Sequence, residues 1–256
     1  MEVKEEYSLE ICYIYDGSFE GLLTAVYDAY YSKIKPTEIL EEEDFQPSLI
    51  NEPYYIKTDS VKADKVHNAI RNKISEDALE NIFYTYLSSY KGKGTLIYNY
   101  IKLGFKYENK VDLHTYDDTI IKIHKVRNRV AGEQHIMLGF VRFEAISKNL
   151  YYSSIEPDHN ILTLIAPHFA SRLADQNWII HDLKREVAAI YNRVEWAVVP
   201  FEKNKVPSFN ENASEDFYTG LWKDYFTSTA ITNRINPKLQ RMKVPIRYWK
   251  HMTEFK

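Results

Sequence analysis

Residues Glu133 to Tyr191 decide the expected fold, and they read EQHIMLGFVRFEAISKNLYYSSIEPDHNILTLIAPHFASRLADQNWIIHDLKREVAAIY. The alternation of side chains from Phe140 to Ala145 predicts a strand with two different faces. Ser147-Lys148-Asn149 then turns the chain into a second strand-like run, Tyr151 to Ile155. Together the two runs predict an antiparallel hairpin.

A helix and three more strands are expected after this hairpin. Asp158 can cap a helix whose apolar positions run from Ile161 to Leu173, with a kink at Pro167. The further strands, separated by short turns, are Trp178 to His181, Val187 to Tyr191 and Val194 to Val199. The order β-β-α-β-β-β predicts an α+β protein with an antiparallel sheet and a helix across one face.

The N-terminal part of the chain adds one strand to this expected core. Leu9 to Tyr15 is rich in β-branched and aromatic residues, which predicts a strand. Asp16 and Gly17 form a structural turn after it, because a glycine there indicates a backbone angle that other residues resist. Ser18 is the expected N-cap of a helix that runs to about Ser32.

A mainly helical region is expected to be inserted between the first strand and the main sheet, at about residues 58–131. Lys35 to Pro53 is interpreted as a loop and Tyr54 to Lys57 as a short strand. The expected helices run from about Asp59 to Lys73, from Ser75 to about Ser89, from just after Lys91-Gly92-Lys93-Gly94 to a C-cap at Gly104, and from Asp112 to Arg129, the last one ended by Gly132. The predicted organisation is an α+β core over 1–200, a linker over 201–216, and a basic aromatic helical tail over 217–256 that packs on the core.

Positive charge is concentrated in two places although the net charge is −3. Residues 221–256 hold eight Lys and Arg against two acids, and residues 120–131 hold four bases and no acid. These regions are either ordinary solvated faces or an electrostatic footprint for nucleic acid. Arg142 could instead pair with Glu144 or Glu156. The candidate nucleic-acid-binding residues are Lys122, Lys125, Arg129, Arg142, Arg241, Arg247 and Trp249.

The composition favours a cytoplasmic protein. Cys12 is the single cysteine, so neither a disulfide within the chain nor a cysteine-built zinc site can form. The N-terminus is acidic and lacks the long apolar segment of a secretory signal. No run of 18 apolar residues is present, and we therefore expect no membrane span.

Six motifs distributed over nearly the whole chain carry a family resemblance. They are Tyr15-Asp16-Gly17-Ser18-Phe19-Glu20-Gly21, Tyr100-x-x-Leu103-Gly104-Phe105, Glu133-x-His135-x-Met137-x-Gly139-Phe140-Val141-Arg142-Phe143, Ile155-Glu156-Pro157-x-His159, Ala166-Pro167-His168-Phe169-Ala170-x-Arg172, and Asn236-Pro237-x-Leu239 with Met242-x-x-Pro245-x-x-Tyr248-Trp249. In these motifs the chain resembles an uncharacterised bacterial family described as putative DNA metabolism or DNA repair proteins.

The resemblance implies a context rather than a reaction. Genes of that family sit beside a gene for a radical-SAM protein, and some relatives carry an added domain similar to uracil-DNA glycosylase. This sequence lacks the cysteine cluster that a radical-SAM enzyme needs for its iron–sulfur cluster. We therefore expect the chain to be the partner of the radical-SAM protein, with DNA as a further partner.

Polar residues within the motifs supply a candidate catalytic site: His135, Glu156 and His168, which suit general acid–base chemistry. Glu133 and His159 belong to the same motifs. The alternative is structural, with the acidic groups capping a helix and the histidines satisfying buried backbone groups. The spacing matches no known metal motif, so no metal or cofactor is assigned. Three hypotheses remain: a DNA-contacting accessory protein, a stand-alone hydrolase or lyase, and a non-catalytic scaffold.

Overall fold

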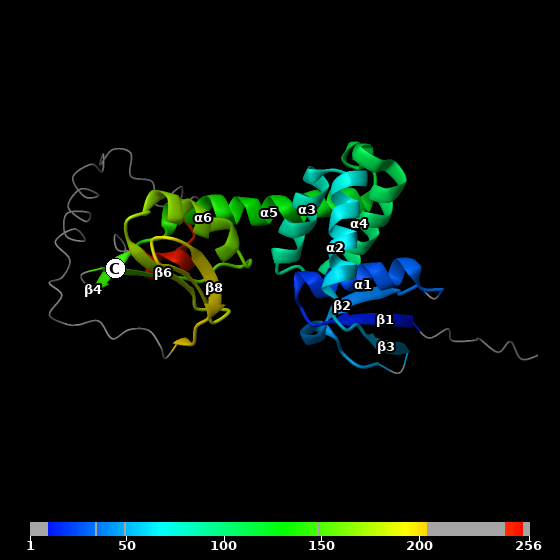
Figure 1. Ribbon diagram of the computed structural model, residues 1–256, viewed down its shortest axis with the longest axis horizontal. Helices are drawn as coiled ribbons and strands as arrows, with labels where there is room; N and C mark the ends of the chain where they lie inside the picture. The colour runs from blue at the N-terminus through cyan, green and yellow to red at the C-terminus, as the bar shows by residue number, and fades with distance from the viewer. Residues whose placement is uncertain (1–9, 34, 49, 148, 204–243, 253–256) are drawn as a thin grey trace, which may run out of the picture. The chain divides into compact units, whose positions relative to one another are not determined.

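The computed structural model of the protein describes residues 10–33, 35–48, 50–147, 149–203 and 244–252 (Figure 1). The chain forms two compact units, Met1–Ala131 and Gly132–Lys256. Both contain helices and a sheet, so the protein is α+β as the sequence predicts. No helix within the described ranges is long and apolar enough to cross a membrane.

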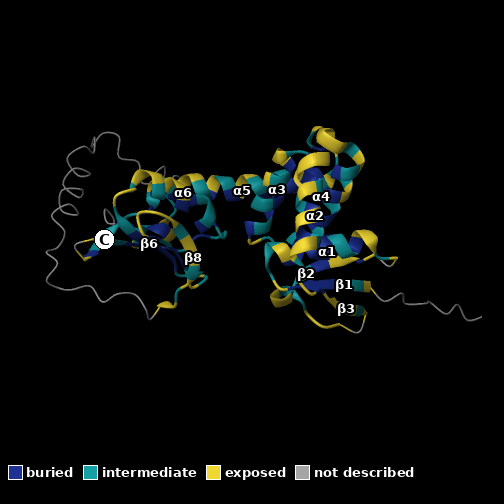
Figure 2. Cartoon of the chain, in the orientation of Figure 1, coloured by how far each residue is buried: buried dark blue, intermediate teal, exposed yellow. Residues whose placement is uncertain are grey.

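The sheet of the first unit is parallel. It has the order β2-β1-β3, with β1 (Glu10–Tyr15) between β2 (Glu38–Glu41) and β3 (Asn51–Tyr55). The expectation that the N-terminal strand joins the antiparallel core sheet is therefore wrong. The burial of β1 explains its place, because Cys12 to Tyr15 are all buried (Figure 2), and central parallel strands are covered on both faces.

Two short strands occur in the region interpreted as a loop. β2 and the start of β3 lie within residues 35–53, and η1 (Glu42–Asp44) follows β2 directly. The apolar content of β2 is only Ile39 and Leu40, which is too little for a periodic pattern. Its pairing with β1 is a tertiary contact, and Thr95 on α4 (Lys93–Tyr107) also donates to the Ile39 carbonyl at 3.3 Å.

The helices of the first unit begin where the sequence predicts. α1 (Phe19–Tyr31), α2 (Ser60–Lys73) and α3 (Glu76–Leu87) have N-caps Ser18, Asp59 and Ser75. Each capping side chain accepts a hydrogen bond from an amide of the first turn, which otherwise has no partner within the helix. The helices bury one apolar core, whose fully buried large residues include Leu22, Ile70, Ile82, Ile97 and Ile101.

α4 (Lys93–Tyr107) does not end at Gly104, which corrects the predicted C-cap. Gly104 lies inside the helix, and a Cβ there would overlap with the side chain of Ile74. Glycine at this position therefore allows close packing of α4 against the end of α2. The C-cap is Glu108, and η2 (Glu108–Leu113) follows.

α5 (Asp118–Phe140) begins later and ends later than the sequence predicts. The helix passes through Gly132, the expected end, and it includes Phe140, the expected start of a strand. Its buried positions continue past the glycine from Val130 to Glu133 and Met137, at helical spacing. A glycine in a helix interior costs only about 1 kcal/mol. The burial of these positions past Gly132 outweighs this cost, so the helix continues.

The sheet of the second unit is mixed rather than antiparallel. Its order is β4-β5-β6-β7-β8, which is also the order along the chain. The strands are β4 (Glu144–Ser147), β5 (Leu150–Ile155), β6 (Asn177–Asp182), β7 (Val187–Tyr191) and β8 (Trp196–Pro200). β5 and β6 are parallel, and the other neighbours are antiparallel. The predicted β-β-α-β-β-β order is confirmed, but the helix connects two parallel strands, as such crossovers commonly do.

α6 (Leu162–Arg172) is this crossover helix, and it packs against β6, β7 and β8. Its N-cap position is Ile161, which makes no side-chain cap, so Asp158 is not the cap that the sequence predicts. Pro167 lies inside the helix. The apolar centre of the unit is Trp178, fully buried, with its ring 5.3 Å from that of Tyr191.

Of the predicted linker and tail, only residues 201–203 and 244–252 are described. The second segment contains η5 (Ile246–His251), which contacts β5 and so packs on the second unit. The other residues of the predicted linker and helical tail, 204–243 and 253–256, lie outside the described residues.

Candidate functional site

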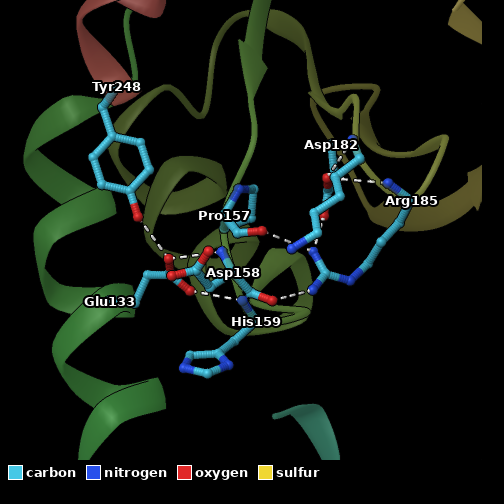
Figure 3. Close-up of polar contacts among 8 residues, drawn as sticks. Glu133, Pro157, Asp158, His159, Asp182, Arg185 and Tyr248 are labelled. Carbon is cyan, nitrogen blue, oxygen red and sulfur yellow. Dashed lines mark hydrogen bonds and ion pairs between the residues drawn. The ribbon is translucent and has the colours of Figure 1, made fainter. Parts of the chain in front are cut away.

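The carboxylate of Glu133 joins three segments of the second unit (Figure 3). Glu133 lies on α5 with 7% of its surface exposed. Its Oε1 accepts hydrogen bonds from the backbone amide of Asp158 at 2.8 Å and from the Tyr248 hydroxyl at 2.6 Å. Its Oε2 accepts from the backbone amide of His159 at 2.8 Å. We call these contacts the Glu133 junction.

The Asp158–His159 loop is also held from its other side. Arg185 donates to the carbonyl of Pro157 at 3.2 Å and to that of Asp158 at 2.6 Å. The same guanidinium pairs at 2.7 Å with Asp182, whose side chain is fully buried at the end of β6. A buried carboxylate needs such a partner, because an unpaired charge in the interior is strongly unfavourable. The loop backbone is therefore fixed by Glu133 and Arg185 together.

The tail segment docks on this loop through η5. Arg247 pairs with Asp158 at 2.6 Å, lies 3.7 Å from Glu133, and donates to the hydroxyl of Tyr248 at 2.7 Å. The Tyr248 hydroxyl thus accepts a hydrogen bond from Arg247 and donates one to Glu133. Lys250 pairs with Glu156 at 2.6 Å. Charge-assisted bonds of this kind are about twice as strong as neutral ones.

The environment shifts the pKa of the Tyr248 phenol and of the His159 imidazole at the junction. Burial raises the pKa of the Tyr248 phenol, and the hydrogen bond to Glu133 raises it further, so the phenol stays protonated and can donate. Burial lowers the pKa of the His159 imidazole, with help from Arg185 and Lys184 and against Glu133 and Asp158. His159 is consequently neutral at neutral pH.

These contacts decide what the junction can do chemically. The two oxygens of Glu133 already accept three short hydrogen bonds, so this carboxylate is a positioning group rather than a free base. In Figure 3 the imidazole of His159 extends away from that carboxylate, from a loop whose backbone is fixed. The junction therefore fixes the backbone that carries a half-buried imidazole, and the lowered pKa of this ring favours the neutral form that a general base requires.

The three residues of the predicted catalytic site occupy different elements. His135 is exposed on α5, His168 is exposed on α6 with its ring 5.1 Å from that of Phe169, and Glu156 follows β5. Glu156 pairs with Lys250 and lies 3.9 Å from His251, and these partners lower its pKa. Among the described residues, no hydrogen bond or ion pair joins His135, Glu156 and His168 to one another. Their shared catalytic role stays a prediction.

The predicted nucleic-acid-binding residues separate into two groups. Lys122, Lys125 and Arg129 are exposed on one face of α5, and we call them the α5 stripe. None of the three has a carboxylate partner among the described residues. Lys122 Nζ lies 5.0 Å from the centre of the Tyr90 ring.

The second group is engaged in contacts within the second unit. Arg142 is not on a strand; it donates to the carbonyl of Gly139 at 2.6 Å and so caps the end of α5. Arg247 belongs to the Glu133 junction, and the Trp249 indole donates to the Val244 carbonyl at 2.9 Å. Arg241 lies outside the described residues.

The Asp16–Gly17 turn fixes the end of β1 against the start of α1. Gly17 adopts φ +80°, a conformation that L side chains rarely adopt. Asp16 accepts from the amide of Ser18 at 3.0 Å and from the hydroxyl of Thr58 at 2.8 Å. A Cβ at Gly21 would overlap with the Asp16 carboxylate, so the second glycine of the motif makes room for it.

Sequence reasoning does not assign the residues that form the junction. Glu133, His159 and Tyr248 stand in the quoted motifs, but nothing local shows that they meet. The available signal is a carboxylate on the apolar stripe of α5, four residues before Met137. Such a position requires hydrogen-bond partners from elsewhere in the fold.

Comparison with known proteins identifies the family. A family model described as a domain of unknown function, DUF4130, matches residues 91–254, more than half of the 256 residues. This range holds α4, α5 and the second unit with the Glu133 junction, while the parallel sheet of the first unit lies before it. A search of the curated proteins found no match. The chain belongs to the family defined by the DUF4130 domain of unknown function.

Proposed function

We propose that this protein is a DNA-metabolism accessory protein that contacts the phosphate backbone of DNA through the α5 stripe and acts with a radical-SAM partner. One observation carries the proposal of DNA contact. Three cationic side chains, Lys122, Lys125 and Arg129, are exposed together on one helix face with no described carboxylate partner. Phosphate responds to such local charge more than to the net charge of −3.

The surrounding contacts support the choice of these three residues. Arg127 on the same helix pairs with Glu80 at 2.6 Å and lies over the Tyr84 ring, so it belongs to the fold of the first unit. His124 contacts Asp112 at 3.0 Å. The stripe thus differs from these two neighbours on α5, whose polar groups already face a carboxylate.

Salt-dependent DNA binding tests the proposal. The change of Lys122, Lys125 and Arg129 together to Ala should flatten the slope of log affinity against log salt on a duplex by about 0.9 for each phosphate that is no longer neutralised. A matched control is Lys102→Ala with Lys106→Ala on α4, two lysines that lie over Tyr98 and Tyr107 as Lys122 lies over Tyr90. An unchanged slope in the triple variant, or no binding of the full chain at low salt, contradicts the proposal.

The radical-SAM partner rests on the family resemblance, and it has its own test. The neighbouring radical-SAM protein and this chain, produced together with a tag on one of them, should copurify at moderate salt. The triple variant of the α5 stripe should still copurify, because the proposal assigns the stripe to DNA. If the two proteins do not copurify at either low or moderate salt, the partnership is contradicted.

A further inference from the structure

The first unit contains a hollow lined by tyrosines that the proposed function does not use. Its volume is about 720 Å³, and its lining comes from α1, α2 and the end of α4. Sites for small molecules typically measure roughly 300–1,000 Å³. The hollow is therefore large enough for a single nucleotide, and its chemistry favours one.

The aromatic lining leaves ring surface open. Tyr30 is 52% exposed and Tyr31 is 71% exposed, although both belong to the largely buried helix α1. The Tyr31 ring centre is 4.6 Å from that of Tyr27, and the Tyr30 ring centre is 5.7 Å from that of Phe105. The rings thus support one another in place. Lys35 Nζ lies 5.9 Å from the centre of the Tyr30 ring, so the more exposed Tyr31 ring offers the more open surface to a planar ligand. Aromatic side chains of this kind are the stacking platforms on which unpaired bases lie.

The polar lining is cationic. Lys65 and Lys73 on α2 line the hollow, both are exposed, and neither has a carboxylate partner within the described ranges. Glu108 is the carboxylate of the lining, so the cations exceed the anions there. Asn72 offers both donor and acceptor groups, which suit the edge of a base. Stacking faces beside these lysines match the two chemical parts of a nucleotide.

A second hollow of about 540 Å³ shares Tyr31 with the first, but its charges differ. Its lining includes Asp28 and Glu52, and its lysine, Lys62, is already paired with Asp28 at 2.7 Å. Phosphate would be repelled there, so the inference is confined to the first hollow, which we call the tyrosine pocket. The high exposure of Tyr31 would let a nucleic-acid strand enter and leave the tyrosine pocket.

We propose that the tyrosine pocket binds one unpaired nucleotide of a single-stranded nucleic acid. The base stacks on the Tyr31 ring with Tyr30 at its edge, because the two rings are inclined at 68° to each other. An adjacent phosphate contacts Lys65 and Lys73. This binding extends the proposed nucleic-acid function, but it uses other residues than the α5 stripe. It selects single strands, because a base paired within a duplex cannot present its face to the rings.

Binding of the full chain to three fluorescent or competing probes tests the proposal. The probes are an oligothymidylate of about 12 nucleotides, within the usual site sizes for single strands, a duplex of the same length, and free thymidine monophosphate. Changing Tyr30 and Tyr31 together to Ala should weaken oligothymidylate binding about 5- to 100-fold. The matched control is Tyr55→Ala, because Tyr55 is 63% exposed and lines neither hollow.

The lysines have a separate readout. Lys65→Gln with Lys73→Gln should reduce the salt slope for the oligothymidylate by about 0.7 for each phosphate that is no longer neutralised. Lys57→Gln is the control, since Lys57 is exposed and lies in neither hollow. Far-ultraviolet circular dichroism of every variant verifies that the fold is kept.

Three results would overturn the proposal: no binding of the oligothymidylate by the wild-type chain, wild-type affinity in the Tyr30/Tyr31 variant, or equal affinity for free thymidine monophosphate. The duplex probe separates this inference from the α5 stripe. Loss of duplex binding in the stripe variant, with oligothymidylate binding retained, supports both assignments. If the wild-type chain does not bind the duplex but the Tyr30/Tyr31 variant loses oligothymidylate binding, the proposed role of the α5 stripe is refuted and that of the tyrosine pocket is supported.

Discussion

The two units of this protein differ in how polar contacts fix their elements. In the first unit, the helix starts are fixed by neighbours in the sequence, as in the bond from the Gly21 amide to the Ser18 hydroxyl three residues before it. In the second unit, the Tyr248 hydroxyl bonds to Glu133 across 115 positions. The first unit also has long-range polar contacts, such as the bond from the Tyr86 hydroxyl to the Gly17 carbonyl across 69 positions. In the second unit, by contrast, one buried carboxylate accepts three bonds that join separate segments.

Two natural probes separate the units in solution. The described tryptophans, Trp178, Trp196 and Trp249, lie in the second unit, and the single cysteine, Cys12, lies in the first. Tryptophan fluorescence therefore follows the second unit, and thiol accessibility follows the first. Each prediction below can be checked by asking which probe responds.

The largest effect is expected at the Glu133 junction. Glu133→Ala removes the acceptor of the Asp158 and His159 amides and of the Tyr248 hydroxyl, and it leaves Arg247 near a vacant position. Leaving a buried donor without its acceptor costs about 1–3 kcal/mol, and two amides and the Tyr248 hydroxyl lose their acceptor here. The urea midpoint followed by tryptophan fluorescence should fall accordingly, while the reactivity of Cys12 before unfolding should not change.

An exposed glutamate provides the control for this prediction. Glu195→Ala, at the exposed turn between β7 and β8, should change the free energy of unfolding by less than about 0.5 kcal/mol. A destabilisation of under about 1 kcal/mol for Glu133→Ala would show that the second unit does not depend on the junction, and the contrast between the units would disappear.

An intermediate effect is expected at Gly94, on α4 of the first unit. A Cβ at this position would overlap with the backbone carbonyl of Ile39 on β2, which cannot rotate away as a side chain can. Gly94→Ala should destabilise the first unit by about 1–3 kcal/mol through overpacking. Urea unfolding followed by Cys12 reactivity provides the measurement.

The matched variant on α5 should have the opposite sign. Gly132 lies in the helix interior, and a Cβ there meets nothing within 4 Å. Gly132→Ala should therefore stabilise the chain by about 0.5–1 kcal/mol, since alanine is the better helix former. Equal effects of the two substitutions would mean that close packing of α4 on β2 does not matter.

A smaller, pH-dependent effect is expected at Asp16. Burial raises the pKa of this carboxyl, but hydrogen bonds from Ser18 and Thr58 outweigh it and lower the pKa below its ordinary value. A lowered folded-state pKa stabilises the fold above the unfolded-state value of about 3.9 and loses this contribution as the pH falls through the folded value. Asp16→Asn should cost about 0.5–1 kcal/mol at neutral pH, as weakened capping contacts do.

The sign of the pH dependence provides the check. The difference in urea midpoint between wild type and Asp16→Asn, followed by circular dichroism, should be constant from about pH 5 to 7 and should shrink below about pH 4. A difference that grows on acidification would be inconsistent with the contacts of Asp16. The substitution should leave tryptophan fluorescence of the second unit unchanged.

Thiol labelling of Cys12 is expected to have the smallest effect, because the reagent does not perturb the native fold before the chain unfolds. Cys12 is 2% exposed on β1, and burial, with a contribution from Glu38, raises the pKa of its thiol to about 11. Because the thiolate is the reactive form, a disulfide reagent at about pH 8 should react at least about 100-fold more slowly with the native chain than with the urea-unfolded chain, whose thiol pKa is about 8.5. Comparable rates would show that β1 is not a central strand.

The candidate site shows where sequence reasoning stops. Adjacent residues predict the Asp16–Gly17 turn, and the structure places Gly17 at φ +80°. The Glu133 junction has no such local signature, since its partners come from α5, the loop before α6 and η5. Conversely, His135, Glu156 and His168 stand in neighbouring motifs but have no described bond to one another, because proximity in the sequence does not fix direction in space.

Local chemistry in the sequence determined the β-β-α-β-β-β order of the second unit, the capped starts of α1, α2 and α3, and the α+β class. These features depend on side chains within a few residues of the backbone that they satisfy. Tertiary structure alone decided that β1 pairs with β2 and β3 in parallel, that β5 and β6 are parallel, and that α5 continues through Gly132. Those outcomes depend on which buried surfaces and unpaired backbone groups meet after the chain has folded, and no local pattern contains that information.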